Sequence, residues 1–153
     1  DPVNLVLSWT SALLYRDTAA LLARHGLHPG FGVLHTSRDG VPALASDLIE
    51  ALRAPIAEAL TVTLFNNRVL DRDDFEKNAD GSNRMDAEAS RRMIREYERW
   101  LSQPVRLVPG GDEVLWRGVI EEQVLAYKRH ILDGEPFTPY AIGAKRGWPK
   151  PVT

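Results

Sequence analysis

The sequence predicts an all-α protein, a single helical domain of about six helices over residues 1–153. Apolar side chains recur at helical spacing through several long segments, which is the main signal for amphipathic helices. Proline and glycine residues punctuate the chain between those segments. A chain of this length favours one domain and can bury a core without disulfides or a structural metal.

Helices are expected over five clear segments, residues 5–24, 43–53, 56–69, 86–101 and 113–132. In the first, apolar residues that include Leu5, Trp9, Leu13 and Leu21 recur near helical spacing, which predicts its buried side. Pro2 stands in a first-turn position and Gly26 follows the last turn, and both are common residues at helix ends. Pro42 suits the first turn of the second helix, and Pro55 must break or kink the chain because it lacks a backbone donor. Asp86 is the expected N-cap of the fourth helix.

The segments between and after these helices carry turn signals. The run from Asn78 to Asn83 is rich in turn-forming residues and allows a small β-hairpin near residues 75–85. Residues 104–111 contain proline and paired glycines, which predicts a loop. The segment after Gly134 contains further prolines and predicts either an extended strap or a frayed end.

Composition narrows the function classes. The chain has no cysteine, so a metal site must use histidine and carboxylates; the absence also fits a reducing cytoplasm. The net charge of −2 and the sequence pI of about 6.1 are not typical of a protein whose binding is dominated by phosphate contacts. No apolar run approaches the roughly 20 residues of a membrane span, and no signal peptide is visible. We therefore expect a cytoplasmic protein with no membrane partner.

Three residues stand out as a candidate metal site: His35, Asp47 and Glu50. Asp47 and Glu50 are three residues apart on the second helix, so they share one side of it, and the loop before that helix carries His35. Carboxylate oxygens with one neutral imidazole suit Mg²⁺ or Mn²⁺, the cations used in phosphoryl transfer. The ordinary alternative is a solvated helix face with a surface histidine, and spacing alone favours that alternative.

Two motifs lie before and within the second expected helix. Residues 26–35 read Gly-Leu-His-Pro-Gly-Phe-Gly-Val-Leu-His, and residues 47–55 read Asp-Leu-Ile-Glu-Ala-Leu-Arg-Ala-Pro. The first is similar to the Gly-Leu, Pro, Gly and apolar run ending in His of the Cas1 family of CRISPR-associated DNA integrases and endonucleases, and the second resembles that family's Asp-Leu-Met-Glu-Glu-Phe-Arg-Pro signature. Weaker similarities lie at residues 1–4, 12–15, 116–117, 123 and 137–140, so the resemblance spans nearly the whole chain in order.

The resemblance implies functional roles for single residues. His35 and Glu50 match the family's metal ligands, Asp47 matches an active-site acid beside them, and Tyr15 matches an aromatic hydroxyl near the site. For Tyr15, a core tyrosine is an equal alternative. The implied cofactor is Mg²⁺ or Mn²⁺. The implied reaction is transesterification of a DNA 3′-hydroxyl onto a phosphodiester of the CRISPR repeat, with nuclease activity on branched DNA. The implied partners are protospacer and repeat DNA, Cas2 and a second Cas1 subunit.

One feature of the family has no match in this chain. Cas1 proteins also use a glutamate from a segment that precedes the motif containing Asn4, and the β-rich domain that pairs two subunits also precedes it. The chain is therefore expected to be the C-terminal helical catalytic domain, and to be a poor enzyme by itself. A non-catalytic helical interaction or DNA-binding module is the alternative function.

Candidate DNA contacts are Arg53, Lys128 and Arg129. The two cations near the end of the last helix also complement its dipole, so a phosphate contact is not required to explain them. An arginine stripe on the fourth helix, at positions 92, 95 and 99, is interleaved with glutamates and predicts a solvated face with ion pairs rather than a DNA contact.

Overall fold

The computed structural model describes residues 1–28, 43–107 and 110–140. Its elements follow in the order α1 (Pro2–Arg24), α2 (Ala43–Leu52), η1 (Arg53–Glu58), α3 (Ala59–Asn66), η2 (Arg72–Asp74), β1 (Phe75–Lys77), β2 (Asn83–Met85), α4 (Ala87–Leu101), β3 (Pro104–Arg106), β4 (Glu113–Leu115) and α5 (Trp116–Asp133). The helices confirm the all-α prediction. The described residues form five α-helices rather than about six, with two small hairpins beside them.

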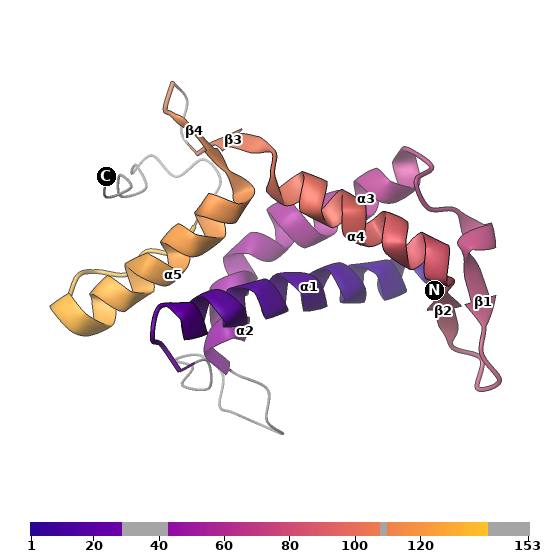
Figure 1. Cartoon of the computed structure of the whole chain (residues 1–153), viewed down its shortest axis with the longest axis horizontal. Coiled ribbons are helices and arrows are strands. Elements are labelled where there is room, and N and C mark those ends of the chain that lie inside the picture. The colour runs from indigo at the N-terminus through magenta and orange to yellow at the C-terminus, as the bar shows by residue number, and fades with distance from the viewer. Residues whose placement is uncertain (29–42, 108–109, 141–153) are drawn as a thin grey trace.

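Helix α1 runs lengthwise through the molecule and contacts α2, η1, α3 and α5 (Figure 1). It begins earlier than expected, because the side chain of Asp1 accepts a hydrogen bond from the backbone N–H of Val3 and caps the first turn. It ends as expected at Gly26, whose φ of 77° is in the left-handed region. The N–H of Leu27 then reaches back to the carbonyl of Leu22 at 2.9 Å, which satisfies a free carbonyl of the last turn.

The buried side of α1 differs from the expected one. Residues four apart on α1 are almost completely buried: Val6, Thr10, Leu14, Thr18 and Leu22. The apolar pattern had suggested Trp9 instead, which is 43% exposed. Two of the buried residues are threonines, which hydrogen-bond within their own helix to the carbonyls four residues back. Their hydroxyls are therefore satisfied without water, and a polar residue can occupy the buried side.

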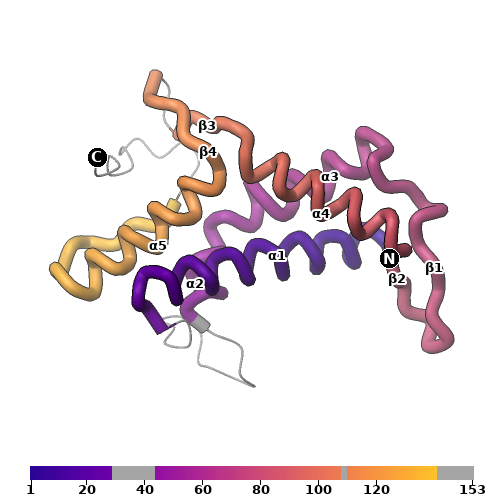
Figure 2. The backbone as a smooth tube through the Cα atoms, viewed as in Figure 1, coloured from indigo at the N-terminus to yellow at the C-terminus, as the bar shows by residue number. Residues whose placement is uncertain are grey.

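The chain does not break at Pro55. It remains helical from α2 through η1 into α3, a path that Figure 2 shows as one continuous rod packed against α1. Segment η1 is a π-helical turn, in which the N–H of Ala59 donates to the carbonyl of Ala54, five residues back. The wider turn accommodates the ring and the missing donor of Pro55, so the expected helix ends at Arg53 and Ile56 are replaced by a change of helix type.

Both hairpins are antiparallel. The expected hairpin near residues 75–85 is present as β1–β2, closed by Gly81 at a φ of 82°. The second, β3–β4, lies where a loop was expected at residues 104–111. Because β4 includes Glu113–Leu115, α5 begins at Trp116 rather than at residue 113. An exposed ion pair of 3.0 Å between Arg106 and Glu113 links the two paired strands of this hairpin. Pro104 begins the first strand, where a missing N–H is tolerated.

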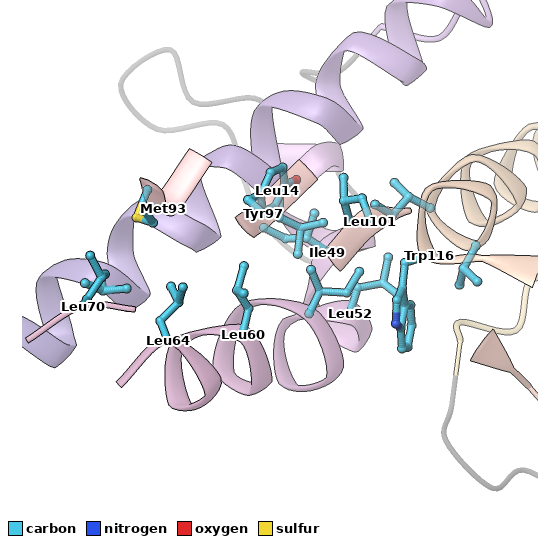
Figure 3. Close-up of a cluster of buried hydrophobic side chains, with 14 of the residues drawn as sticks. Leu14, Ile49, Leu52, Leu60, Leu64, Leu70, Met93, Tyr97, Leu101 and Trp116 are labelled. Atoms are coloured by element: carbon cyan, nitrogen blue, oxygen red, sulfur yellow. The ribbon is translucent and has the colours of Figure 1, made fainter. Parts of the chain in front are cut away.

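The main core lies where α1, the rod from α2 to α3, and α4 meet (Figure 3). Large side chains of these helices build it, together with one from the connection after α3 and one from the start of α5. They are Leu14, Ile49, Leu52, Leu60, Leu64, Met93, Tyr97 and Leu101, with Leu70 and Trp116. A second, smaller core joins the end of α1 to the first half of α2 and to α5, and contains Leu22, Leu44, Ala45, Leu48, Val124 and Tyr127. Helix α2 is therefore packed from two directions.

Residues 135–140 fold back along α5, and we call this segment the strap. It starts after Gly134, whose φ of 72° ends the helix. Phe137 then packs edge-on against Tyr127 with ring centroids 5.3 Å apart, and Tyr140 packs against Trp116 at the start of α5. The extended-strap prediction is confirmed for these residues. In the described part of the chain, no helix is long and apolar enough to cross a membrane.

Candidate active site

Helix α2 turns its leucines inward and its two acids away from the core. Leu44 and Leu48 are 2% and 3% exposed in the smaller core. Asp47 is half-buried beside them, and the side chain of Glu50 is 65% exposed. A helix with a packed apolar side thus presents two carboxylates near its other side, one turn apart.

His35 lies outside the described residues, so the prediction that its imidazole faces Glu50 stays a prediction. Within residues 1–28, 43–107 and 110–140, no three histidine or carboxylate side chains gather closely enough to hold a metal ion. The two acids of α2 therefore form the part of the candidate site that the structure describes. Their oxygens are hard donors of the kind that Mg²⁺ and Mn²⁺ prefer.

Glu50 has a cationic neighbour on the next turn. An Nη of Arg53 lies 3.5 Å from a carboxylate oxygen of Glu50, with both side chains substantially exposed. The Nε of Arg53 is buried and has no hydrogen-bond partner among the described residues. A guanidinium that is partly open to solvent and not fully paired can bind a phosphate oxygen beside this acid.

Asp47 lies near an aromatic side chain of α5. Burial raises the pKa of Tyr127, and the negative charge of Asp47 raises it further. Tyr127 is 6% exposed and packs in the smaller core with Leu44 and Leu48, the two leucines that flank Asp47 on α2. The second acid of the site therefore lies near a phenol whose pKa is raised, and which is neutral at ordinary pH.

Tyr15 of α1 also lies beside the smaller core. It contacts both hydrophobic cores from a partly buried position. Its hydroxyl is buried with no hydrogen-bond partner in the described part of the chain, and burial raises its pKa. An unpaired buried hydroxyl is uncommon in a folded protein, because it loses its hydrogen bonds to water. This is consistent with a hydroxyl that binds a group outside the described residues.

The two cations predicted to contact DNA on α5 have partners within the protein. Arg129 pairs with Glu122 at 2.6 Å and with Glu135 of the strap at 3.4 Å. Lys128 donates to the backbone carbonyl of His25, at the end of α1, at 2.7 Å. The contact with Glu122 stays within α5, whereas those with Glu135 and with the carbonyl of His25 join α5 to the strap and to the end of α1.

The arginine stripe of α4 forms the expected ion pairs. Arg95 reaches Glu88 at 3.4 Å, and Arg99 reaches Glu96 at 2.6 Å. Arg92 pairs with Asp74 and also donates to a backbone carbonyl of the preceding connection. These contacts confirm that the stripe is a face with ion pairs.

Gln123 is a further residue of this region, which the sequence did not assign to the site. It is 1% exposed on α5. Its Nε2 donates to the backbone carbonyl of Leu48, between Asp47 and Glu50 on α2, and its Oε1 accepts from the N–H of Tyr140 at 2.8 Å. The available signal was a glutamine within the apolar stripe of an otherwise amphipathic helix.

Comparison with known proteins identifies relatives over most of the chain. The family described as CRISPR associated protein Cas1 matches residues 1–99. The chain is 32% identical over 143 residues to a CRISPR-associated endonuclease Cas1 of Thermus thermophilus, covering 93% of this chain and 43% of the relative. It is 35% identical over 140 residues to a Cas4/Cas1 exonuclease–endonuclease fusion of Rhodospirillum rubrum, covering 92% of this chain and 24% of the fusion. The chain thus spans less than half the length of these relatives.

Solved structures show the same fold. A casposase bound to its integration product matches with a TM-score of 0.82 at 20% identity, covering 99% of this chain and 41% of the casposase. A Cas1 protein of Thermotoga maritima matches with a TM-score of 0.76 at 23% identity, covering 88% of this chain and 42% of that protein. A Cas6-RT-Cas1–Cas2 complex contains a match at 25% identity with a TM-score of 0.74, covering 96% of this chain and 16% of the matched chain.

Proposed function

This chain belongs to the Cas1 family of CRISPR-associated proteins, and from that we propose that it is the helical catalytic domain of a metal-dependent DNA integrase and endonuclease. The observation that carries the proposal is the placement of Asp47 and Glu50. Both lie on α2, on the side that the leucine core leaves open, within the region that matches the family. The curated relatives are named endonucleases, which supports a phosphodiester as the substrate.

The residues present fit a hard divalent cation. Glu50 and Asp47 supply carboxylate oxygens, and His35 would supply an imidazole nitrogen from the segment before α2. A bound Mg²⁺ or Mn²⁺ would polarise the scissile phosphate and neutralise part of its charge. Such ions prefer about six ligands. Two or three protein ligands hold one weakly, so a further acid and a DNA phosphate would have to complete the set.

The proposed reaction is a transesterification. The oxygen of a DNA 3′-hydroxyl forms a bond to phosphorus, and the bond from that phosphorus to the leaving 3′-oxygen of the target strand breaks. The attacking hydroxyl gives up one proton and the leaving oxygen takes up one, so the reaction needs no oxidant or energy source. The protein supplies positioning, with Arg53 beside Glu50 available to a phosphate oxygen.

The proposed partners are DNA, Cas2 and a second Cas1 subunit. The similarity to a chain of a Cas6-RT-Cas1–Cas2 complex supports Cas2, and the fold shared with a casposase bound to an integration product supports DNA. Two such sites would act on the two ends of one DNA fragment. We place the protein in the cytoplasm, where a CRISPR array is accessible.

The test is strand transfer of a labelled DNA duplex into a supercoiled plasmid, with Mn²⁺ and Cas2, by the complete gene product that contains this chain. Glu50→Gln and Asp47→Asn keep the size of each side chain and remove its charge. Both variants are expected to lose most of the activity. Glu58→Gln is the matched control, because Glu58 is exposed on the same helical rod and lies away from the two acids. Activity of Glu50→Gln equal to that of Glu58→Gln would refute the site.

A non-catalytic helical module is the second candidate function. The acidic pI of about 6.1 favours it, since DNA binding by the chain alone would have to rely on a local patch. The two functions differ in their response to Mn²⁺. A catalytic domain binds the ion more weakly after Glu50→Gln, whereas a non-catalytic module shows no difference between that variant and the wild type.

A further inference from the structure

The side chain of Gln123 joins three segments that are far apart in the sequence. It projects from α5, donates to the carbonyl of Leu48 on α2, and accepts from the N–H of Tyr140 in the strap. At 1% exposure, it has no access to water that could replace either bond. Few side chains can serve both partners, because the position requires one donor and one acceptor on the same small group.

The orientation of this amide follows from its partners. The backbone N–H of Tyr140 can only donate, so the Oε1 of Gln123 must face it. The Nε2 must then face the Leu48 carbonyl, which can only accept. Docking of the strap thus determines which atom of Gln123 is directed at α2.

The bond falls on the turn of α2 that carries both acids. Leu48 follows Asp47 directly and precedes Glu50 by two residues. A donor held against the Leu48 carbonyl resists rotation of α2 about its axis and sliding along it. Either motion would move both carboxylates, because their directions are fixed by the backbone of this turn.

A second contact of α5 supports the same turn. Tyr127 lies one turn after Gln123 and packs against Leu44 and Leu48, with its phenol near Asp47. Phe137 of the strap packs edge-on against Tyr127 at 5.3 Å. The strap therefore contacts two of the α5 side chains that face α2, by a hydrogen bond at Gln123 and by aromatic packing at Tyr127.

We propose that Gln123 is a positioning residue for the active site: its buried amide, oriented by the backbone of Tyr140, fixes the turn of α2 that presents Asp47 and Glu50. The inference rests on the function proposed above. It predicts that the amide acts on the chemical step and on metal affinity, with no direct role in holding DNA.

The test uses the complete gene product with Cas2 and compares Gln123→Met with Tyr97→Phe. Methionine matches the length of glutamine and removes both hydrogen bonds. Tyr97→Phe is the matched control, because it removes one hydrogen bond between helices, from α4 to Asp17 of α1, that involves no atom of α2. We expect kcat and Mn²⁺ affinity to fall by about 10- to 100-fold in Gln123→Met, with the KM for DNA unchanged. Tyr97→Phe should keep wild-type values.

Gln123→Leu keeps the proposal testable if Gln123→Met does not fold. Its side chain is close in size to that of glutamine and can neither donate to Leu48 nor accept from Tyr140. The same loss of kcat is expected. Wild-type kcat in either folded variant would overturn the positioning role. If Asp47→Asn and Glu50→Gln are also active, the proposed function itself fails; if these two are inactive, only the role of Gln123 is refuted.

Discussion

The hydroxyl oxygens of Thr10 on α1 and Thr61 on α3 lie 3.2 Å apart in the interior, and both residues are at most 2% exposed. Each hydroxyl also contacts the carbonyl of Ala57, at 3.4 Å and 2.7 Å respectively. The two threonines thus form a small polar junction between antiparallel helices, at the end of the π-helical turn.

Replacing either threonine by valine keeps the shape and removes a hydroxyl. Thr10→Val and Thr61→Val are each expected to lower the free energy of unfolding by about 1 kcal/mol, because a buried hydrogen bond is lost and its partner remains. The double variant should lose less than the sum of the two, since no hydroxyl is then left without its partner. Urea unfolding measures all three, and a strictly additive double variant would show that the two hydroxyls do not interact.

Leu60 on α3 is part of the main core and 2% exposed. Leu60→Ala is expected to lower the free energy of unfolding by about 2–5 kcal/mol, through lost burial and a residual cavity. Val62→Ala is the control on the same helix, because Val62 is 56% exposed, and it should cost less than about 0.5 kcal/mol. The denaturant midpoints of the two variants measure these losses. Similar losses in both variants would contradict the burial of Leu60 in the core.

Two glycines, one inside α5 and one directly after it, should respond to alanine in opposite directions. Gly134 has a φ of 72° at the end of the helix, and Gly134→Ala is expected to destabilise the protein by about 1 kcal/mol. Gly118 lies inside the helix with open space around it, and Gly118→Ala is expected to stabilise by about 0.5–1 kcal/mol. Thermal unfolding gives the two signs, and equal shifts would contradict the helix end at Gly134.

The Tyr97 phenol predicts a response at alkaline pH. Burial and the negative charge of Asp17, to which it donates at 2.9 Å, raise its pKa well above the ordinary value. The unfolded chain ionises this group near pH 10, whereas the folded chain does not, so its contribution to stability is complete below about pH 10 and declines as the pH rises further. Above that pH, the wild type should lose stability more steeply than Tyr97→Phe. Parallel curves in urea unfolding from pH 8 to 11 would contradict the buried pair.

Much of the fold could be predicted from periodicity and helix-end signals, but the rotation of α1 could not. The buried side includes Thr10 and Thr18, whose hydroxyls are satisfied within the helix, while Trp9 is partly exposed. A hydropathy pattern counts threonine as polar and tryptophan as apolar, so it placed the buried side one residue away. The sequence left open whether the chain breaks or kinks at Pro55, because a missing donor at one residue does not show whether the chain breaks or widens its turn.

The candidate site could be predicted in part. The spacing of Asp47 and Glu50 determined that they share a side of α2, and the structure places the helix leucines in the core. The roles of Gln123 and Tyr127 depend on which helices lie side by side, and that information is tertiary. A single sequence also gives no means to recognise that a strap of mostly irregular backbone would supply the donor for Gln123.

The π-helical turn at Arg53–Glu58 determines how the side-chain directions of α2 are related to those of α3 around the axis of one long rod. Each residue of an α-helix advances the side-chain direction by about 100°, so one residue more or fewer changes which side faces inward. Deleting a single residue of this turn would leave α2 and α3 intact as helices but would rotate one relative to the other about their common axis. Either the acids of α2 would rotate toward the core or the leucines of α3 would rotate toward solvent. A lineage that kept both could therefore exchange residues within this turn far more easily than it could change their number.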